Sequence, residues 1–144
     1  MAFQGFIKGV RYIPVPAPIF GDLLAEIQDI TELKIVLRII RLLHNKRGLE
    51  RYITLDELVA DRILASGIST SNVATRKTEI FRALKASVKR KILIRVDRET
   101  NPTATYFLNT EFERQTIDKI KQSETQSDHE PWEAKEDRAN IYSL

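Results

Sequence analysis

The chain has 144 residues with a formal net charge of +3, and 42% of them are hydrophobic, which suits one domain with a compact core and a tail. Because it has no cysteine, disulfides, thiolate metal sites and thiol nucleophiles are excluded. The sequence contains no apolar run of ~18 residues and no signal-peptide pattern at its N-terminus, so we expect a cytoplasmic protein without a membrane span.

Residues 1–19 are apolar but show no regular period. Pro14, Pro16 and Pro18 alternate with other residues, which forces an extended backbone and excludes a helix. The segment is too apolar for a disordered tail, so we expect it to pack along the body or along a second subunit. It supplies four residues of a predicted oligomer interface: Phe3, Phe6, Tyr12 and Ile13.

A short helix is predicted next, over Ile19–Ile30, because its apolar residues follow helical spacing and Pro18 can open it. The inward residues are expected to be Phe20, Leu23, Leu24 and Ile27.

Residues 32–45 form the predicted central helix, capped by Asp29 or Thr31 and ending near Gly48. Eight of the eleven positions 33–43 are apolar, and they cover roughly 220° of the helix circumference, about twice what a surface helix buries. Such a helix must be covered on two sides, one of them by a second layer or a partner chain. Its predicted interface residues are Ile35, Ile39 and Leu42.

The sequence pattern after Gly48 predicts a short strand and two further helices. Arg51–Thr54 has strand character, and Thr54 with Glu57 forms a capping box. The helix that follows should run to about Ala65 and end at Gly67, burying Leu55, Leu58, Val59 and Ile63. Another helix is predicted from about Arg76 to Lys91, with three inward residues: Phe81, Leu84 and Val88.

Two alternating segments, Ile92–Asp97 and Thr103–Asn109, predict a β-hairpin with a loop of roughly five residues. Thr110 and Glu113 form a second capping box, which opens a helix carrying Phe112, Ile117 and Ile120.

Beyond Lys121 the apolar periodicity is lost, which predicts a solvated linker. We therefore divide the chain into 1–121, a folded domain with an N-terminal arm, and 122–144. The second part is expected to be an acidic linker followed, at Asn140–Leu144, by the start of a missing second helical domain.

The order helix, short strand, helix, helix, hairpin is that of a winged helix-turn-helix, in which the third helix is the usual reader of the major groove. The predicted fold class is mainly α with a small β-hairpin (α+β), with an N-terminal extension and an extra C-terminal helix.

Positive charge gathers on the predicted third helix and wing. Residues 70–98 carry nine Lys/Arg against two acidic residues, whereas residues 122–144 carry two against six. DNA phosphates require cations spread along a rigid surface. The candidate DNA contacts are Arg76, Lys77, Arg82, Lys85, Lys89, Arg95 and Arg98. The alternative is a solvated helix face, and the residues 89–91 at the far end of the helix suit phosphates or an acidic protein better than base edges.

No residue pattern predicts catalysis or a cofactor. His44 and His129 are distant and have no cysteine beside them, so they make no metal site. Helix capping and a solvated face explain Asp56, Glu57 and Asp61, and the five scattered glycines form no phosphate loop. We expect no metal, no cofactor, no catalytic residue and no enzymatic activity.

Four segments together resemble the N-terminal winged-helix domain of DnaD-like bacterial DNA replication proteins. They are residues 12–48, 52–64 (YITLDELVADRIL), 83–96 (ALKASVKRKILIRV) and 106–110 (YFLNT). The closing RANIYSL is similar to the opening of that family's second, helical domain, through Asn140, Ile141 and Leu144. The resemblance is a pattern of core positions and lengths and includes no catalytic signature.

The resemblance implies a primosome component that helps remodel DNA at initiation or restart and helps bring in the helicase machinery. In that family the N-terminal domain serves mainly self-assembly and protein contacts, and the missing helical domain carries much of the DNA binding. The expected partners are a second copy in a dimer or larger assembly, other replication-initiation proteins and, more weakly, DNA. The alternative is a DNA-binding winged-helix transcriptional regulator.

Overall fold

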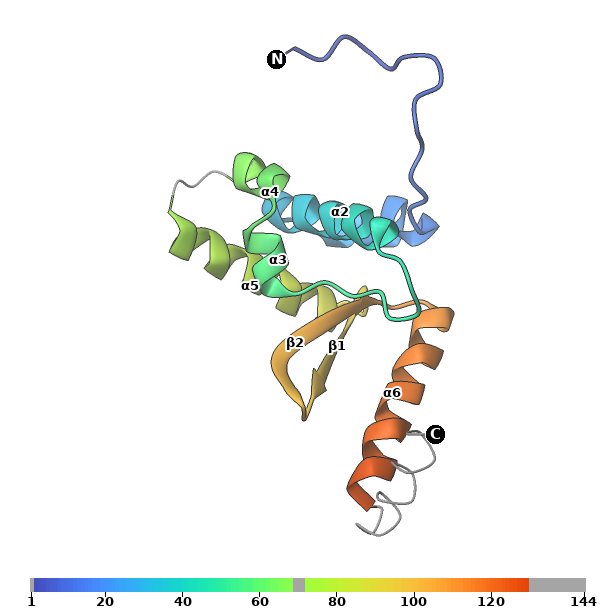
Figure 1. The fold of residues 1–144 in the computed structure, drawn as a ribbon. Helices are drawn as coiled ribbons and strands as arrows, with labels where there is room; N and C mark the ends of the chain where they lie inside the picture. Colours follow the sequence, from blue (N-terminus) through green and yellow to red (C-terminus); the bar gives the residue numbers. More distant parts are fainter. Residues whose placement is uncertain (1, 69–71, 130–144) are drawn as a thin grey trace.

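The structure is a computed structural model that describes residues 2–68 and 72–129. These residues form six α-helices, one 3-10 turn and one two-stranded antiparallel hairpin, which confirms an α+β architecture (Figure 1). In chain order the elements are η1 (Ala17–Phe20), α1 (Asp22–Glu26), α2 (Ile30–Asn45), α3 (Leu55–Val59), α4 (Arg62–Gly67), α5 (Val73–Lys89), β1 (Leu93–Arg98), β2 (Asn101–Leu108) and α6 (Glu111–His129). No helix within the described ranges is long and apolar enough to cross a membrane.

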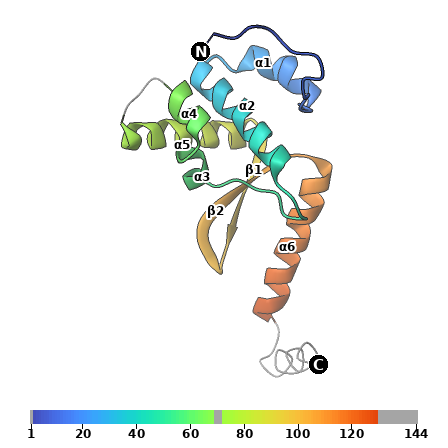
Figure 2. The same ribbon diagram turned by 45° about the horizontal axis from the view of Figure 1, so that its top comes forward.

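Helix α2 is the centre of the main core, as its apolar density predicts. Asp29 is the N-cap, and its Oδ1 accepts a hydrogen bond of 2.9 Å from the Thr31 amide, which settles the choice between the two capping residues. The helix packs against α5 and α4 (Figure 2). Its fully buried apolar residues are Ile35, Val36, Ile39, Ile40 and Leu43.

The single helix expected over Ile19–Ile30 is two short pieces, η1 and α1. The break comes at Gly21, whose amide donates to the Pro18 carbonyl at 3.1 Å and closes the 3-10 turn. The chain leaves the helical conformation at Ile27 so that Asp29 can take the extended backbone of an N-cap. Ile27 is buried and Leu23 half-buried, but Phe20 and Leu24 are exposed, so the predicted inward set is only partly correct.

The predicted strand at Arg51–Thr54 is reduced to one bridge. Ile53 exchanges two backbone hydrogen bonds of 3.0 and 2.9 Å with Tyr106 of β2. The capping residue Thr54 is confirmed, because its hydroxyl accepts from the Glu57 amide at 3.2 Å.

The helix predicted to run to Ala65 is interrupted after Val59, which gives α3 and α4. Asp61 causes the interruption: its Oδ2 accepts from the Leu64 amide at 3.0 Å and so caps α4. The rotation of α4 leaves Ile63 58% exposed, so its predicted burial is wrong.

Helix α5 begins at Val73, three residues before the predicted start, because the Asn72 Oδ1 accepts from the amides of Ala74 and Thr75. Its buried residues are Ile80, Ala83, Leu84 and Ser87. Phe81 is 38% exposed, so its predicted burial is wrong, and the neighbouring Ile80 is buried in its place. Val88 is only half-buried.

The hairpin that follows pairs Leu93 with Leu108 and Arg98 with Asn101, with a register shift between Val96 and Arg98. The strands therefore extend further than predicted and leave a shorter turn than the expected five residues.

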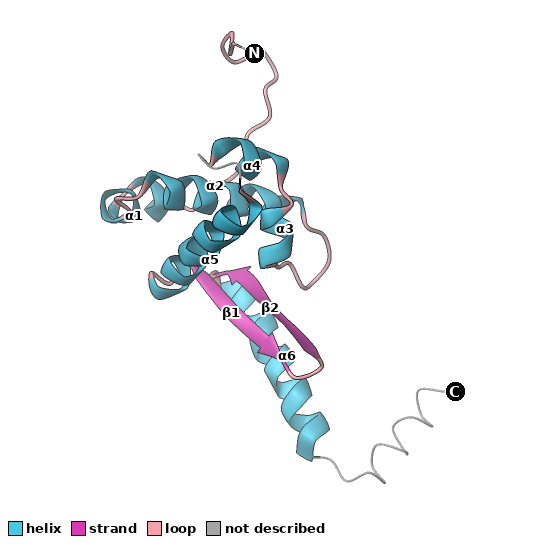
Figure 3. Cartoon of the chain, turned by 90° about the vertical axis from the view of Figure 1, so that its left-hand side faces the viewer, coloured by secondary structure: helices cyan, strands magenta, loops and turns pink. Residues whose placement is uncertain are grey.

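Helix α6 lies along the hairpin and completes a second, smaller core (Figure 3). Val96 and Phe107 of the hairpin pack with Ile117 and Ile120 of the helix. The Thr110 hydroxyl accepts from the Glu113 amide at 3.3 Å, as the capping box predicts. The helix continues to His129, so residues 122–129, expected to be linker, are its last turns. The division at residue 121 stays a prediction, and the predicted start of a second domain at Asn140–Leu144 lies outside the described residues.

Candidate nucleic-acid and assembly surfaces

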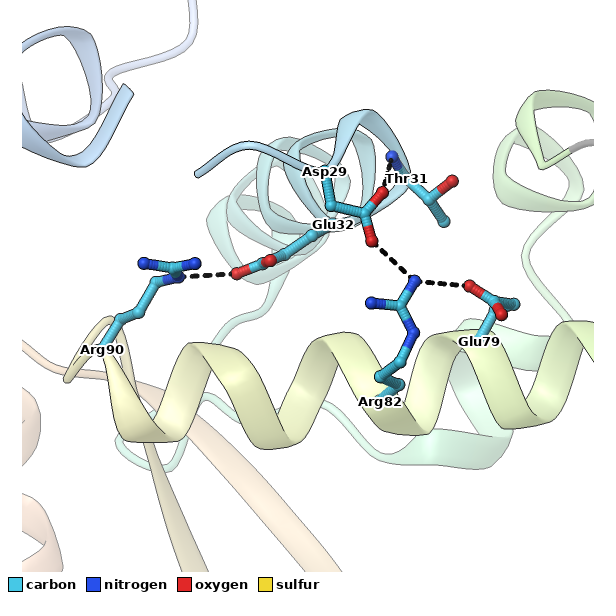
Figure 4. Close-up of polar contacts among 6 residues, drawn as sticks. All are labelled: Asp29, Thr31, Glu32, Glu79, Arg82 and Arg90. Carbon is cyan, nitrogen blue, oxygen red and sulfur yellow. Dashed lines mark hydrogen bonds and ion pairs between the residues drawn. The ribbon is translucent and has the colours of Figure 1, made fainter. Parts of the chain in front are cut away.

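Two arginines, Arg82 within α5 and Arg90 at its C-cap, are held against the beginning of α2 and the segment before it (Figure 4). Arg82 Nη2 lies 2.6 Å from Asp29 Oδ2 and 2.6 Å from Glu79 Oε2. Arg90 Nε lies 2.8 Å from Oε1 of the buried Glu32, and its Nη1 lies 3.6 Å from Glu26. These contacts join α5 to the N-cap and first turn of α2.

The pKa shifts agree with this structural role. The hydrogen bond from Arg82 lowers the pKa of Asp29, although partial burial of the carboxyl group opposes the shift. The hydrogen bonds to Glu79 and Asp29 raise the pKa of Arg82, and the bond to Glu32 raises that of Arg90. Each guanidinium is therefore already compensated by carboxylates of its own chain, which makes it a weak candidate for a phosphate contact.

The lysines of α5 differ from Arg82 in their partners, although Lys89 lies only about 20° from Arg82 around the helix. Positions 77, 81, 85 and 89 follow each other at about 40° per step around an α-helix, so they share one face. Lys77, Lys85 and Lys89 are exposed and form no ion pair with any residue in the described ranges. Lys85 Nζ lies 5.6 Å from the centre of the Phe81 ring, a cation–π contact. This lysine face is the part of the predicted basic surface that remains open to an anion.

The other predicted DNA contacts are not gathered on this face. Arg76 donates to the Val59 carbonyl at 3.4 Å. Arg95 pairs with Asp97 at 3.2 Å, and Arg98 at the end of β1 pairs with Glu50 at 2.8 Å. Arg98 lines a hollow of about 560 Å³ beside α6 rather than the surface of α5. The structure thus brings together three of the seven predicted residues.

The predicted oligomer interface residues also do not lie on one surface: some are exposed on the arm and others are buried in the core. Phe3, Phe6 and Tyr12 are 74%, 83% and 86% exposed, and the two phenylalanine rings touch each other edge to face with centroids 5.0 Å apart. Ile35 and Ile39 are 0% and 1% exposed. They belong to the chain's own core, so their assignment to an interface is corrected.

The remaining two interface residues are half-buried. Leu42 packs against the main core, and Ile13 lies near the base of the arm. The arm, defined here as residues 2–16, is therefore attached at its base and uncovered towards its tip. Pro14, Val15 and Pro16 form one wall of a hollow of about 380 Å³, and the other walls come from α2, Arg51, the end of β2 and the start of α6.

A second concentration of positive charge was not predicted from the sequence. Arg11, Arg41 and Arg47 meet at a hollow near the C-terminal end of α2, together with His44 and Lys46. The short basic run after α2 was the available signal, but the contribution of Arg11 depends on the path of the arm. No cluster of three or more metal-ligating His, Asp or Glu side chains occurs in the described part of the chain.

Comparison of the chain with protein-family models, with curated proteins and with solved structures gave no match. The functional argument therefore depends on the residues and on the geometry described above.

Proposed function

We propose that this chain is the assembly module of a bacterial DNA replication initiation or restart protein of DnaD type. In this proposal it is a cytoplasmic, non-catalytic winged-helix domain that contacts a second copy of itself and other replication proteins. The element order supports the winged-helix assignment: α2, the Ile53 bridge, the short helices α3 and α4, α5 and the β1–β2 hairpin follow one another, which matches that fold if α3 and α4 together stand for its second helix.

The observation that carries the proposal is the set of uncovered apolar side chains along the arm. Phe3, Phe6, Ile7 and Tyr12 are all at least 74% exposed, although the base of the same arm is packed on the body. Figure 1 shows the arm projecting away from the helices. Burying a large aromatic side chain contributes roughly 1.5–3 kcal/mol, so an extended segment with several of them gains most from a partner surface.

The test is the mass of the chain in solution. Replacing Phe3, Phe6 and Tyr12 together by Ser removes the exposed aromatic side chains and keeps the length of the arm. We expect the wild-type chain to sediment as a dimer or larger species and this variant to sediment as a monomer. The control replaces Gln4 and Lys8, polar residues of the same arm, by Ser and should leave the mass unchanged. Equal masses for the triple variant and the wild type would refute assembly through the arm.

A second candidate function is duplex DNA binding by a winged-helix regulator, and the lysine face of α5 favours it. The matching variant changes Lys77, Lys85 and Lys89 to Glu and leaves Arg82 intact, because Arg82 holds α5 to α2. If this face binds DNA, the variant should lose duplex affinity, and the wild-type log–log salt dependence should have a slope of about −3 or steeper. Weak wild-type binding that disappears at physiological salt supports the assembly function instead.

A further inference from the structure

A hollow of about 270 Å³ lies where the base of the arm passes the C-terminal end of α2. Its lining includes Arg11 from the arm, Arg41 and His44 from the last turns of α2, and Lys46 and Arg47 from the chain just after it. No aspartate or glutamate of the described chain lines it. Five side chains that carry or can carry positive charge therefore face one small space.

Among the described residues, only one of these cations has an acidic partner. Lys46 Nζ lies 2.5 Å from Glu57 Oε2. Arg41 donates to the neutral amide oxygen of Asn45, which leaves its charge uncompensated. Arg11 and Arg47 are exposed, and neither forms an ion pair with another described residue.

The helix dipole does not remove this excess. The C-terminus of an α-helix carries about −0.5 elementary charge, and this partial charge favours cations in the last turn. Three uncompensated guanidinium groups carry six times that amount, so the hollow keeps a clear positive excess. Like charges that lie close together repel each other, and an anion bound between them replaces this repulsion by attraction.

We propose that this hollow binds a phosphate group of a nucleic-acid backbone. Guanidinium groups donate paired hydrogen bonds that match the oxygens of a phosphate, and three arginines can approach one phosphate from different sides. Arg11 and Arg47 are exposed at the hollow, so it is open enough to receive one phosphate of a continuous strand. The site is separate from the lysine face of α5, and it uses none of the aromatic residues on which the assembly proposal depends.

The same anion fixes the position of the arm. Arg11 and Arg41 approach the hollow from segments that lie far apart in the sequence, and a phosphate held by both holds the arm base against α2.

The experiment measures binding of fluorescently labelled single-stranded and duplex oligonucleotides to the full chain at several salt concentrations. The variant changes Arg41 and Arg47 to Gln, and the control changes Arg62 to Gln. Arg62 is an exposed arginine of α4 that has no ion pair with a described residue and lies outside the hollow. We expect the double variant to lose affinity about tenfold and to show a salt slope shallower by about one. The control should match the wild type.

Inorganic phosphate alone distinguishes the two sources of the ligand. It is titrated into the protein while the Nε–H resonances of Arg41 and Arg47 are followed by NMR. If phosphate shifts both resonances but the double variant binds oligonucleotides like the wild type, the hollow is a site for free phosphate and the nucleic-acid assignment is overturned. If neither phosphate nor oligonucleotide distinguishes the variant from the wild type, the whole site is refuted. Should the double variant unfold, Arg47→Gln alone gives the same test, because Arg47 follows the helix and is exposed.

Failure here leaves the assembly proposal intact, because the two arginine variants keep every aromatic residue of the arm. Conversely, the aromatic variant keeps all three arginines that line the hollow, so its loss of self-association would not test the phosphate site.

Discussion

Helix α2 and the N-terminal arm are both rich in large apolar residues, but the chain buries one set and leaves the other in solvent. In α2, five aliphatic side chains are almost fully buried between α4, α5 and the segment before it. In the arm, Phe6 and Tyr12 are more than 80% exposed. Hydrophobicity alone therefore does not tell whether a segment belongs to a core.

Backbone geometry explains the difference. A helix places its apolar residues on faces that pack against neighbouring elements, and its amides bond within the helix. The arm is not helical: Gly5 and Gly9 take positive φ values of 102° and 81°, and Pro14 and Pro16 hold its last residues extended, so its side chains do not form one face that a single element could cover. Such a segment can bury these side chains along the surface of another molecule.

The largest expected effect comes from deleting matched apolar side chains in the two regions. Ile39→Ala removes part of a residue that is 1% exposed and should lower the free energy of unfolding by about 3 kcal/mol. Phe6→Ala should leave the free energy of unfolding unchanged when it is measured by chemical denaturation at a dilution where the chain is monomeric. A loss of more than about 1 kcal/mol for Phe6→Ala would show that the arm folds onto its own body.

An intermediate loss of stability is expected when an ion pair of the folded body is broken. The two regions also differ in their ion pairs. Arg38 donates two hydrogen bonds of 2.9 and 3.0 Å to the nearly buried Asp61 carboxylate, whereas Lys8 and Arg11 of the arm have no acidic partner in the described chain. Asp61→Asn keeps a good N-cap but removes the charge, and should cost about 2 kcal/mol at neutral pH. The matched control is Asp56→Asn, an exposed residue of α3.

The pH dependence of stability gives a second measurement of the same pair. The hydrogen bonds from Arg38 lower the pKa of Asp61, although burial opposes the shift. The stabilisation is therefore fully present above the unfolded-state aspartate pKa of about 3.9 and is lost as the pH falls through the lower pKa of the folded state. Thermal melts of Asp61→Asn should show less of this acid-side loss than the wild type. Equal curves would mean that the pair does not stabilise the fold.

The elements that could be predicted from the sequence are those governed by local patterns. The central helix, the capping residues Thr54 and Thr110 and the two strands all depend on neighbours within a few residues. The break at Asp61 was missed although its bond to the Leu64 amide is local, and the contact that also holds its carboxylate comes from Arg38, 23 residues earlier. The face of α5 was ambiguous for a related reason: Phe81 and Ile80 are equally apolar, and only the packing against α2 and α3 selects Ile80.

The candidate surfaces follow the same rule. Charge was enough to select Lys77, Lys85 and Lys89 as candidate contacts, and all three are exposed. They were not enough to show that Arg82 is bound by Asp29, because that contact depends on how two distant helices meet. The hollow near α2 was missed because Arg11 lies in a segment whose path has no periodic signal.

The smallest effect is expected for two cations of α5, of which Arg82 has acidic partners and Lys85 has none among the described residues. Arg82→Gln breaks two ion pairs, but its side chain is 49% exposed, so solvent screening limits the loss of stability to less than about 1 kcal/mol. Lys85→Gln removes a charge without an acidic partner and should change stability by no more than about 0.5 kcal/mol. Duplex affinity should show the opposite order, because Lys85 is open to a phosphate and Arg82 is already compensated. Parallel urea denaturation and oligonucleotide titration of the two variants measure both quantities. If Arg82→Gln weakens DNA binding more than Lys85→Gln while unfolding at the wild-type urea concentration, the arginine contacts the anion and the structural role assigned to it here is wrong.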